Sequence, residues 1–184
     1  MRVLAICGST RTNSYNRRLL RLVADAARSA GATVDEVDLR AHAIPFYDGD
    51  LEEATGLPVE ARWLREQIEA SDALLLATPE YNGSLPAVLK NAIDWVSRPI
   101  GGGRPGGSFR GRPVLVMSAS PGASGGAGAL AHLDTLMRRL GANVLETRIS
   151  LPGVADALDG ELSAELKAQV GALGRAVAGA SQNA

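Results

Sequence analysis

A polar loop, GSTRTNSYN (8–16), follows directly on the first apolar run of the chain, RVLAIC (2–7). Its hydroxyl and amide side chains supply neutral donors, and Arg11 adds a planar cation that can form a forked contact with a phosphate. A loop that leads from a strand into a helix also offers free backbone N–H groups and the positive end of the helix dipole. The loop lacks the lysine and spacing of a P-loop and lacks G-x-G-x-x-G, so a monophosphate suits it better than a pyrophosphate. An ordinary polar helix cap is the alternative interpretation.

A second polar segment, PEYNGSLPAVLKNAIDW (79–95), follows the apolar run ALLLAT (73–78). Pro79, Asn82 and Gly83 shape a turn at its start. Tyr81 offers a flat amphipathic ring, and Glu80 brings a further polar group. Such a turn suits a planar heteroaromatic ligand with polar edges, and an ordinary strand-to-helix connection is the alternative. A third loop, SASPGASGG (118–126), overlaps the end of the apolar run at 113–119.

Short apolar runs alternate with longer segments of helical periodicity along the chain. The pattern predicts strands at 2–7, 33–39, 73–78, 113–119 and 143–149, and helices at 14–30, 58–70, 85–97, 126–140 and from Ser163 onward. Residues 40–57 are expected to be irregular, and residues 180–184 to fray. Ser84 and Ser163 are the expected caps of the helices that follow them.

Strict alternation of strands and helices indicates an α/β fold with a parallel sheet covered on both faces. The first, third and fourth strands are nearly continuous apolar runs, as strands buried on both faces are, whereas the second and fifth carry charges typical of edges. Right-handed crossovers then favour a doubly wound five-stranded sheet in the order 2-1-3-4-5. The strand order reverses between the first and third strands, so the three polar loops are expected to meet at one ligand site.

The composition is that of one soluble domain. The chain has 184 residues, of which 46% are hydrophobic and 21% charged, and its formal net charge of −1 does not point to nucleic acid or a membrane as a partner. Cys7 is the single cysteine, which favours a reducing, cytoplasmic location, and it is expected to be a small buried hydrophobe. His42 and His132 have no companion at ligand spacing, so no metal site is expected.

The two segments GSTRTNSYN and PEYNGSLPAVLKNAIDW resemble the signatures of the NADPH-dependent FMN reductase family, which has a flavodoxin-like fold and includes quinone, azo-dye and chromate reductases. The resemblance extends over residues 2–149. It implies FMN as cofactor and NADPH or NADH as hydride donor. It also implies ping-pong transfer to a quinone, a flavin, an azo compound or a similar small-molecule acceptor, with no side chain acting as catalytic acid or base. The implied assembly is a homodimer or homotetramer.

The resemblance also assigns roles by position. The first loop would hold the FMN phosphate, the second would contact the isoalloxazine ring, and the third would line the pyrimidine edge of that ring. The implied cofactor-binding residues are Ser9, Arg11, Ser14, Tyr15, Asn16, Pro79, Glu80, Tyr81, Asn82, Gly83, Ser118, Ser120, Pro121 and Gly122.

Two other functions would use the same fold and cofactor. A flavodoxin-type electron carrier passes single electrons between proteins and presents a strongly acidic face, whereas this chain has a net charge of −1. A non-catalytic flavin redox sensor would bind FMN and reduce no acceptor. The reductase is favoured, mainly because of segment 79–95.

One segment, RPIGGGRPGGSFRGRP (98–113), is richer in glycine and arginine than the family pattern. Its composition favours a flexible surface linker. A mobile flap or a subunit contact is the alternative, and a flap would bring Arg104 or Arg110 to the 2′-phosphate of NADPH.

Overall fold

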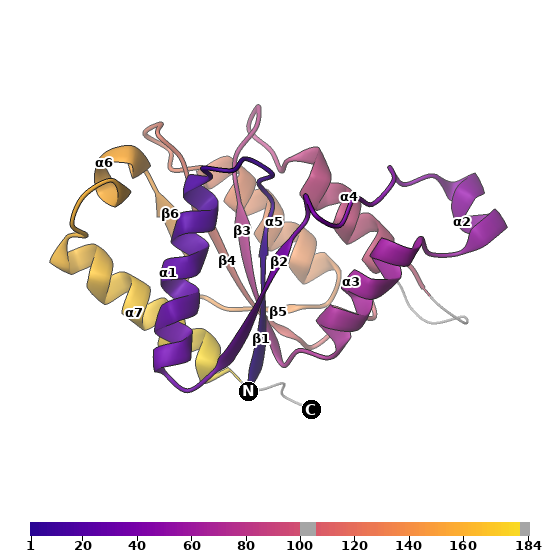
Figure 1. The fold of residues 1–184 in the computed structure, drawn as a ribbon, viewed down its shortest axis with the longest axis horizontal. Helices are drawn as coiled ribbons and strands as arrows, with labels where there is room; N and C mark the ends of the chain where they lie inside the picture. Colours follow the sequence, from indigo (N-terminus) through magenta and orange to yellow (C-terminus); the bar gives the residue numbers. More distant parts are fainter. Residues whose placement is uncertain (100–105, 181–184) are drawn as a thin grey trace.

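A parallel six-stranded sheet runs through the molecule, with helices on both of its faces (Figure 1). The computed structural model describes residues 1–99 and 106–180. The strands are β1 (Arg2–Cys7), β2 (Thr33–Asp38), β3 (Ala73–Thr78), β4 (Pro113–Ala119), β5 (Asn143–Val144) and β6 (Ile149–Leu151). Their order is β2-β1-β3-β4-β5, with β6 also paired to β4. The predicted α/β class, flavodoxin-like architecture and strand order 2-1-3-4-5 are confirmed.

Burial separates the central strands from the edge. Every residue of β3 and β4 is buried, whereas β2 exposes three of its six residues. Because side chains alternate across a strand, Val3, Ala5 and Cys7 of β1 face one core layer and Leu4 and Ile6 face the other. The strands with continuous apolar sequence are therefore central in the sheet, and the charged strand β2 lies at its edge, as predicted.

The outer edge beyond β4 differs from the prediction of one strand at 143–149. Two short strands occupy it, with Val144 opposite Val114 and Ile149 opposite Met117. The chain between them carries two charged side chains that pair with the neighbouring helix instead of continuing the ladder: Arg148 lies 3.0 Å from Asp134, and Glu146 lies 3.3 Å from Arg138.

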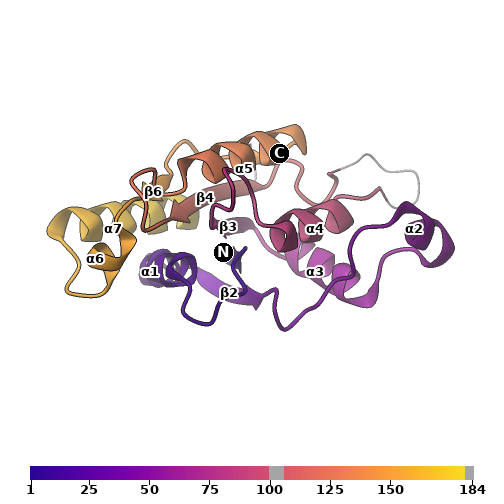
Figure 2. The ribbon, with the colours of Figure 1, turned by 90° about the horizontal axis from the view of Figure 1, so that it is seen from above.

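Three helices cover one face of the sheet and three cover the other. The first group is α1 (Tyr15–Ser29), α6 (Val154–Leu158) and α7 (Ala164–Ala178), and the second is α3 (Val59–Glu69), α4 (Ala87–Val96) and α5 (Ala127–Arg139). The short helix α2 (Gly49–Thr55) lies at the end of the molecule opposite α6 and α7 (Figure 2). None of the helices in the described ranges is both long and apolar enough to cross a membrane.

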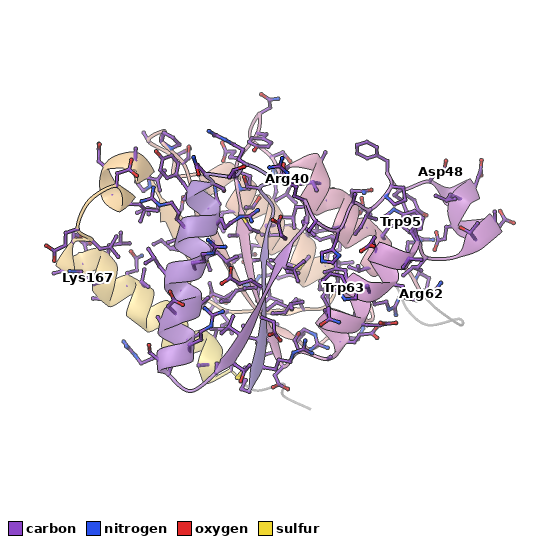
Figure 3. The ribbon with its side chains drawn as sticks, viewed as in Figure 1. Arg40, Asp48, Arg62, Trp63, Trp95 and Lys167 are labelled. Atoms are coloured by element: carbon purple, nitrogen blue, oxygen red, sulfur yellow. The ribbon has the colours of Figure 1, made fainter. Side chains whose placement is uncertain are left out.

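The five longer helices match the predicted segments, but α2 and α6 were not predicted. Helix α2 buries none of its residues, so it has no apolar periodicity to detect. Its start is fixed by Asp48 (Figure 3), whose carboxylate accepts hydrogen bonds from the N–H groups of Asp50 and Leu51 at 2.8 and 3.3 Å. Capping of α7 by Ser163 is confirmed, because the Ser163 Oγ accepts a hydrogen bond from the N–H of Leu166.

Ser84 is not a helix cap, and that prediction is wrong. Helix α4 begins after Pro86, which makes no side-chain capping bond. The Ser84 hydroxyl instead bonds to the Nδ1 of His132 on α5 at 3.2 Å. The backbone is still extended at Pro86, with φ of −67° and ψ of 143°, so the helix starts at the next residue, Ala87.

The glycine-rich segment 98–113 is only partly a linker. Residues 100–105, including Arg104, lie outside the described residues, as do residues 181–184 of the tail that was expected to fray. Residues 106–112 are packed: Phe109 is 1% exposed in the core, and the Ser108 hydroxyl donates to the carbonyl of Val96 at 2.7 Å. A flexible linker is therefore the wrong description for this half.

Arg110 does not lie near the three polar loops. It precedes β4 and packs beside Gly141, which precedes β5, and the two backbones are joined by a 2.8 Å bond from Gly111 N–H to the Gly141 carbonyl. Both positions lie at the amino ends of the strands, whereas the polar loops lie at the carboxyl ends. The predicted contact of Arg110 with a 2′-phosphate at this chain's own site is therefore wrong.

Candidate functional site

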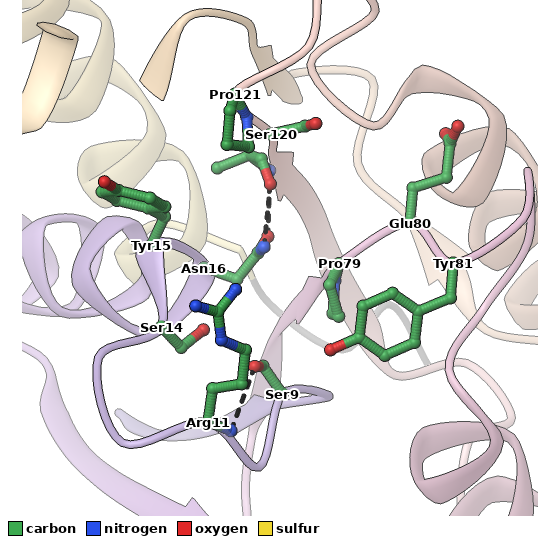
Figure 4. A pocket seen from close by; sticks show the side chains of 11 residues that line it. Ser9, Arg11, Ser14, Tyr15, Asn16, Pro79, Glu80, Tyr81, Ser120 and Pro121 are labelled. Carbon is green, nitrogen blue, oxygen red and sulfur yellow. Dashed lines mark hydrogen bonds between the residues drawn. The ribbon is translucent and has the colours of Figure 1, made fainter. Parts of the chain in front are cut away.

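Three loops at the carboxyl ends of β1, β3 and β4 surround a cavity of about 220 Å³ (Figure 4). They are the three loops that the topology was expected to bring together. The residues that line the cavity are Ser9, Arg11, Ser14, Tyr15, Asn16, Pro79, Glu80, Tyr81, Ala119, Ser120 and Pro121. All of them except Ala119 belong to the predicted set of cofactor-binding residues.

The first loop is held in place by a cation that the sequence analysis did not single out. Arg17 of α1 binds both carboxylate oxygens of Asp38 at 2.8 and 3.0 Å and also donates to the carbonyl of Ser9 at 3.2 Å. The hydrogen bond from Arg17 lowers the pKa of Asp38, and the same bond raises the pKa of Arg17. Strand order 2-1 is the signal that was available, because it places the end of β2 beside this loop.

The start of helix α1 provides the anion-binding features that were predicted. Ser14 caps the helix and accepts a hydrogen bond from the N–H of Arg17, while the N–H of Arg18 bonds to the Ser14 carbonyl. The N–H groups of Tyr15 and Asn16 have no partner within the described chain, and both residues line the cavity. Two free donors at a positive helix end fit a phosphate group.

Arg11 supplies a positive charge at the same end of the cavity. It is exposed, and it forms no ion pair with any described residue. Figure 4 shows its guanidinium directed from the first loop into the cavity. The donor set at this end therefore contains one unpaired cation, two free backbone N–H groups and the hydroxyl of Ser9, which is suited to a single phosphate.

Besides lining the cavity, Asn16 forms backbone contacts that the sequence did not predict. Its side-chain Nδ2 donates to the carbonyl of Ala119 and its Oδ1 accepts from the N–H of Ala119, both at 2.9 Å. The side chain is buried and joins the first loop to the third. One hydrogen of the amide group remains for a further contact.

The second loop forms a tight hairpin. The backbones of Tyr81 and Ser84 exchange hydrogen bonds of 3.0 and 3.1 Å, and the φ angles of Asn82 and Gly83 are 52° and 76°. This is the asparagine–glycine turn that hairpins favour, because both central residues need positive φ. The predicted turn is confirmed, with Asn82 and Gly83 at its tip outside the cavity lining.

Tyr81 forms a side wall of the cavity. Its residue is 48% exposed, and Figure 4 shows its hydroxyl end directed towards the first loop. Glu80 also borders the cavity, but Figure 4 shows its side chain directed away from Pro79, and its Oε2 accepts a 3.0 Å hydrogen bond from the N–H of Ala129 on α5.

The third loop is fixed by the segment that follows β6. The N–H of Ser120 bonds to the Leu151 carbonyl, and the N–H of Val154 bonds to the Ser120 carbonyl. Ser118 is fully buried, and its hydroxyl donates to the carbonyl of Gly125 at 2.9 Å, so it lies outside the cavity lining. Gly122 also lies outside the lining, next to Pro121.

Several reactive or aromatic side chains outside the cavity have structural roles. Cys7 is 3% exposed, and burial raises the pKa of its thiol, which agrees with the predicted small buried hydrophobe. The ring of His42 stacks on Trp63 with centroids 3.7 Å apart. Trp95 (Figure 3) donates through its Nε1–H to the carbonyl of Pro45, and the bond is 2.8 Å long. In the described ranges, no group of three or more histidine, cysteine, aspartate or glutamate side chains is arranged to hold a metal.

Comparison with known proteins agrees with this geometry. A doubly wound parallel sheet in this order, with three polar loops at its strand-order reversal, defines a flavodoxin-like fold with a ligand site at the switch point. The chain belongs to the NADPH-dependent FMN reductase family, whose sequence profile matches residues 1–156.

Individual relatives support the same assignment. The chain is 44% identical over 133 residues to an NAD(P)H-dependent FMN reductase of Pseudomonas aeruginosa, spanning 72% of this chain and 67% of that protein. It is 36% identical over 157 residues to a quinone reductase of Escherichia coli K12, spanning 84% and 78%. Among solved structures, the flavoenzyme NAD(P)H:(acceptor) oxidoreductase of Paracoccus denitrificans superposes with a TM-score of 0.77 at 31% identity and covers 94% of each chain. The chain is therefore an oxidoreductase with FMN as cofactor and NAD(P)H as hydride donor.

Proposed function

We propose that this chain is an FMN-dependent NAD(P)H oxidoreductase that reduces a quinone, a flavin, an azo compound or a similar planar acceptor by a ping-pong mechanism. The observation that carries the proposal is that the three loops converge on one cavity. One end of this cavity is suited to an anion and the other to a planar ring. One end offers Arg11 and the free N–H groups at the start of α1, and the other is bordered by Pro79 and Tyr81.

The residues of the cavity divide the work of binding. Arg11, Ser9 and the start of α1 would hold the phosphate, and Pro79 with Tyr81 would border the ring. Ser120 and Pro121 would lie along its pyrimidine edge. When bound, FMN supplies the redox chemistry, a hydride taken from NAD(P)H and passed to the acceptor. No side chain needs to act as an acid or base, so the protein's part is to bind and orient.

The exposure of the cavity wall supports the proposed ping-pong order. Tyr81 is half exposed at the wall of the cavity, so donor and acceptor would be able to reach the same face of the flavin in turn. An open site of this kind selects acceptors by planarity more than by individual contacts. A broad acceptor range is therefore part of the proposal.

We also propose that the chain assembles as a homodimer or homotetramer, as the family resemblance implies. Phe46 is 78% exposed and Val59 is 77% exposed, and a subunit contact would cover such side chains. Analytical ultracentrifugation would test this assembly, and a monomer at micromolar concentration would refute it. The cytoplasmic location stays a prediction.

The test of function is an anaerobic reduction. The protein is loaded with FMN, NADPH or NADH is added without oxygen, and the visible absorbance of the flavin is followed. Rapid bleaching, followed by recovery of the absorbance when a benzoquinone is mixed in, is the expected result. Bound FMN that neither pyridine nucleotide bleaches would refute the reductase and favour the carrier or the sensor.

A further inference from the structure

Helix α5 begins without a cap of its own. The residue before its first turn is Gly126, which has no side chain to accept the free N–H groups there. The acceptor comes from the hairpin instead: the Oε2 of Glu80 lies 3.0 Å from the N–H of Ala129, the third residue of the helix. Glu80 thus does for α5 what a capping side chain normally does from the adjacent position.

A second bond joins the same two elements. Ser84, at the other end of the hairpin, bonds through its Oγ to the Nδ1 of His132 at 3.2 Å. Ala129 and His132 are three residues apart, so both contacts fall on one side of α5. The hairpin is therefore attached to α5 at both of its ends.

Close packing at the start of α5 supports the same contact. A Cβ built on Gly128 would lie 2.9 Å from the Oε2 of Glu80 and 3.2 Å from the carbonyl oxygen of Gly83. Such distances are too short for any side chain to fit without displacing its neighbours. The helix can approach the hairpin this closely only because residue 128 is glycine.

From these contacts we infer that Glu80 is a positioning residue of the flavin site, and that its carboxylate also sets the reduction potential of the bound flavin. By capping α5, Glu80 fixes the hairpin that carries Tyr81 against the loop that carries Ser120 and Pro121, so two walls of the cavity keep their spacing. Glu80 itself borders the cavity. A negative charge there disfavours electron addition to the ring. This inference rests on the proposed FMN site.

Two substitutions separate the hydrogen bond from the charge. Glu80→Gln keeps an oxygen that accepts from Ala129 N–H but removes the charge, and Glu80→Ala removes both. We expect Glu80→Gln to bind FMN within about threefold of the wild type, and Glu80→Ala to bind at least tenfold more weakly, as measured by fluorescence titration. The midpoint potential of FMN bound to Glu80→Gln should rise by about 30 mV, which corresponds to a tenfold change in the affinity ratio for reduced and oxidised flavin in a two-electron couple.

Gly128→Ala tests the contact from the opposite side. The added methyl group should push the Glu80 carboxylate away from Ala129, so FMN binding should weaken in the wild-type background. The same change should have a smaller effect when Glu80 is already alanine. Equal effects in the two backgrounds would contradict the contact. Glu165→Gln, a first-turn glutamate of α7 away from the cavity, is the matched control and should change neither affinity nor potential.

Amide hydrogen exchange in the FMN-free protein tests the bond from Glu80 to α5 without depending on the proposed function. Exchange of the Ala129 N–H should accelerate in Glu80→Ala and stay slow in Glu80→Gln, whether or not the protein turns over substrate. Unchanged exchange and FMN affinity in Glu80→Ala would overturn the positioning role. An unchanged potential in Glu80→Gln would overturn the electrostatic role. Failure of the wild-type protein to bind FMN would overturn the proposed function and leave the exchange result standing.

Discussion

Asn16 and Ala119 exchange two hydrogen bonds of 2.9 Å between the start of α1 and the end of β4, positions that are 103 residues apart in the chain. Asn16 is 4% exposed and Ala119 is 3% exposed, so water does not compete for either bond. The pair fixes the distance between the loop that would hold the phosphate and the loop that would follow the pyrimidine edge. One buried amide side chain therefore links two of the loops that border the cavity.

Asn16→Ala should lower the free energy of unfolding by about 2–4 kcal/mol, because it leaves the buried N–H and carbonyl of Ala119 without partners. Urea denaturation measures the change. Asn13→Ala, in the same loop but exposed, is the control and should cost less than about 0.5 kcal/mol. A loss for Asn16→Ala no larger than that of the control would show that the exchange of bonds does not support the loop.

Arg11→Ala should weaken FMN binding much more than riboflavin binding, since only FMN carries a phosphate. A charged hydrogen bond contributes about 1.5–3 kcal/mol, which is roughly a 10- to 100-fold change in the dissociation constant. Fluorescence titration with both flavins gives the comparison. Arg21→Ala is the control, because Arg21 is an exposed arginine of α1 that pairs with Glu36 and does not line the cavity. An equal loss for both flavins would place the phosphate elsewhere.

The Arg17–Asp38 pair should make stability depend on pH in the acid range. The hydrogen bond from Arg17 holds the pKa of Asp38 below its usual value in the folded protein. The contribution of the pair is therefore complete above the unfolded pKa of about 3.9, and it is lost as the pH falls through the lower folded pKa. Because the Asp38 side chain is 40% exposed, the contribution is limited to about 0.2–1 kcal/mol.

Urea denaturation of the wild type and Asp38→Asn between pH 7 and pH 3 checks this sign. The variant should be less stable at pH 7, and the difference should shrink as the pH falls below about 4. Asp156→Asn removes an exposed aspartate from α6 and should show no comparable trend. A difference that stayed constant or grew towards acid would show that the pair does not hold Asp38 in its charged form.

Sequence reasoning found the parts of this molecule that depend on periodicity and order. Fully apolar runs such as 73–78 identified the central strands, and the order of the sheet followed from them. Once that order was fixed, the meeting of the three loops was a topological consequence. The same logic would have excluded Arg110 from the site, since a segment that precedes a strand lies at the amino end of the sheet.

What sequence reasoning missed depends on contacts between distant residues. The bonds of Asn16 to Ala119 and of Glu80 to Ala129 join distant residues, so the local sequence pattern does not indicate them. Ser84 was assigned to the nearest helix because caps are normally local, whereas its partner is His132 on another helix. Helix α2 buries nothing, so no apolar stripe marks it. Short helices and long-range polar contacts are fixed by tertiary structure rather than by propensity.

Gly8 is the point at which the first loop passes closest to helix α4. A Cβ built there would lie 2.9 Å from the Cδ2 of Leu89, 3.0 Å from its Cβ and 3.3 Å from the Cγ of Pro86. Gly8→Ala should therefore lower the free energy of unfolding by about 1–3 kcal/mol through overpacking, and it should move the phosphate loop and weaken FMN binding. Gly160→Ala, where an added Cβ would meet nothing within 4 Å, is the control and should be neutral or slightly stabilising. If adding Leu89→Ala to the Gly8→Ala protein restores part of the lost free energy of unfolding, the contact with Leu89 of α4 caused that loss.

A Gly8→Ala protein as stable as Gly160→Ala, with unchanged FMN affinity, would mean that the loop is not confined against α4.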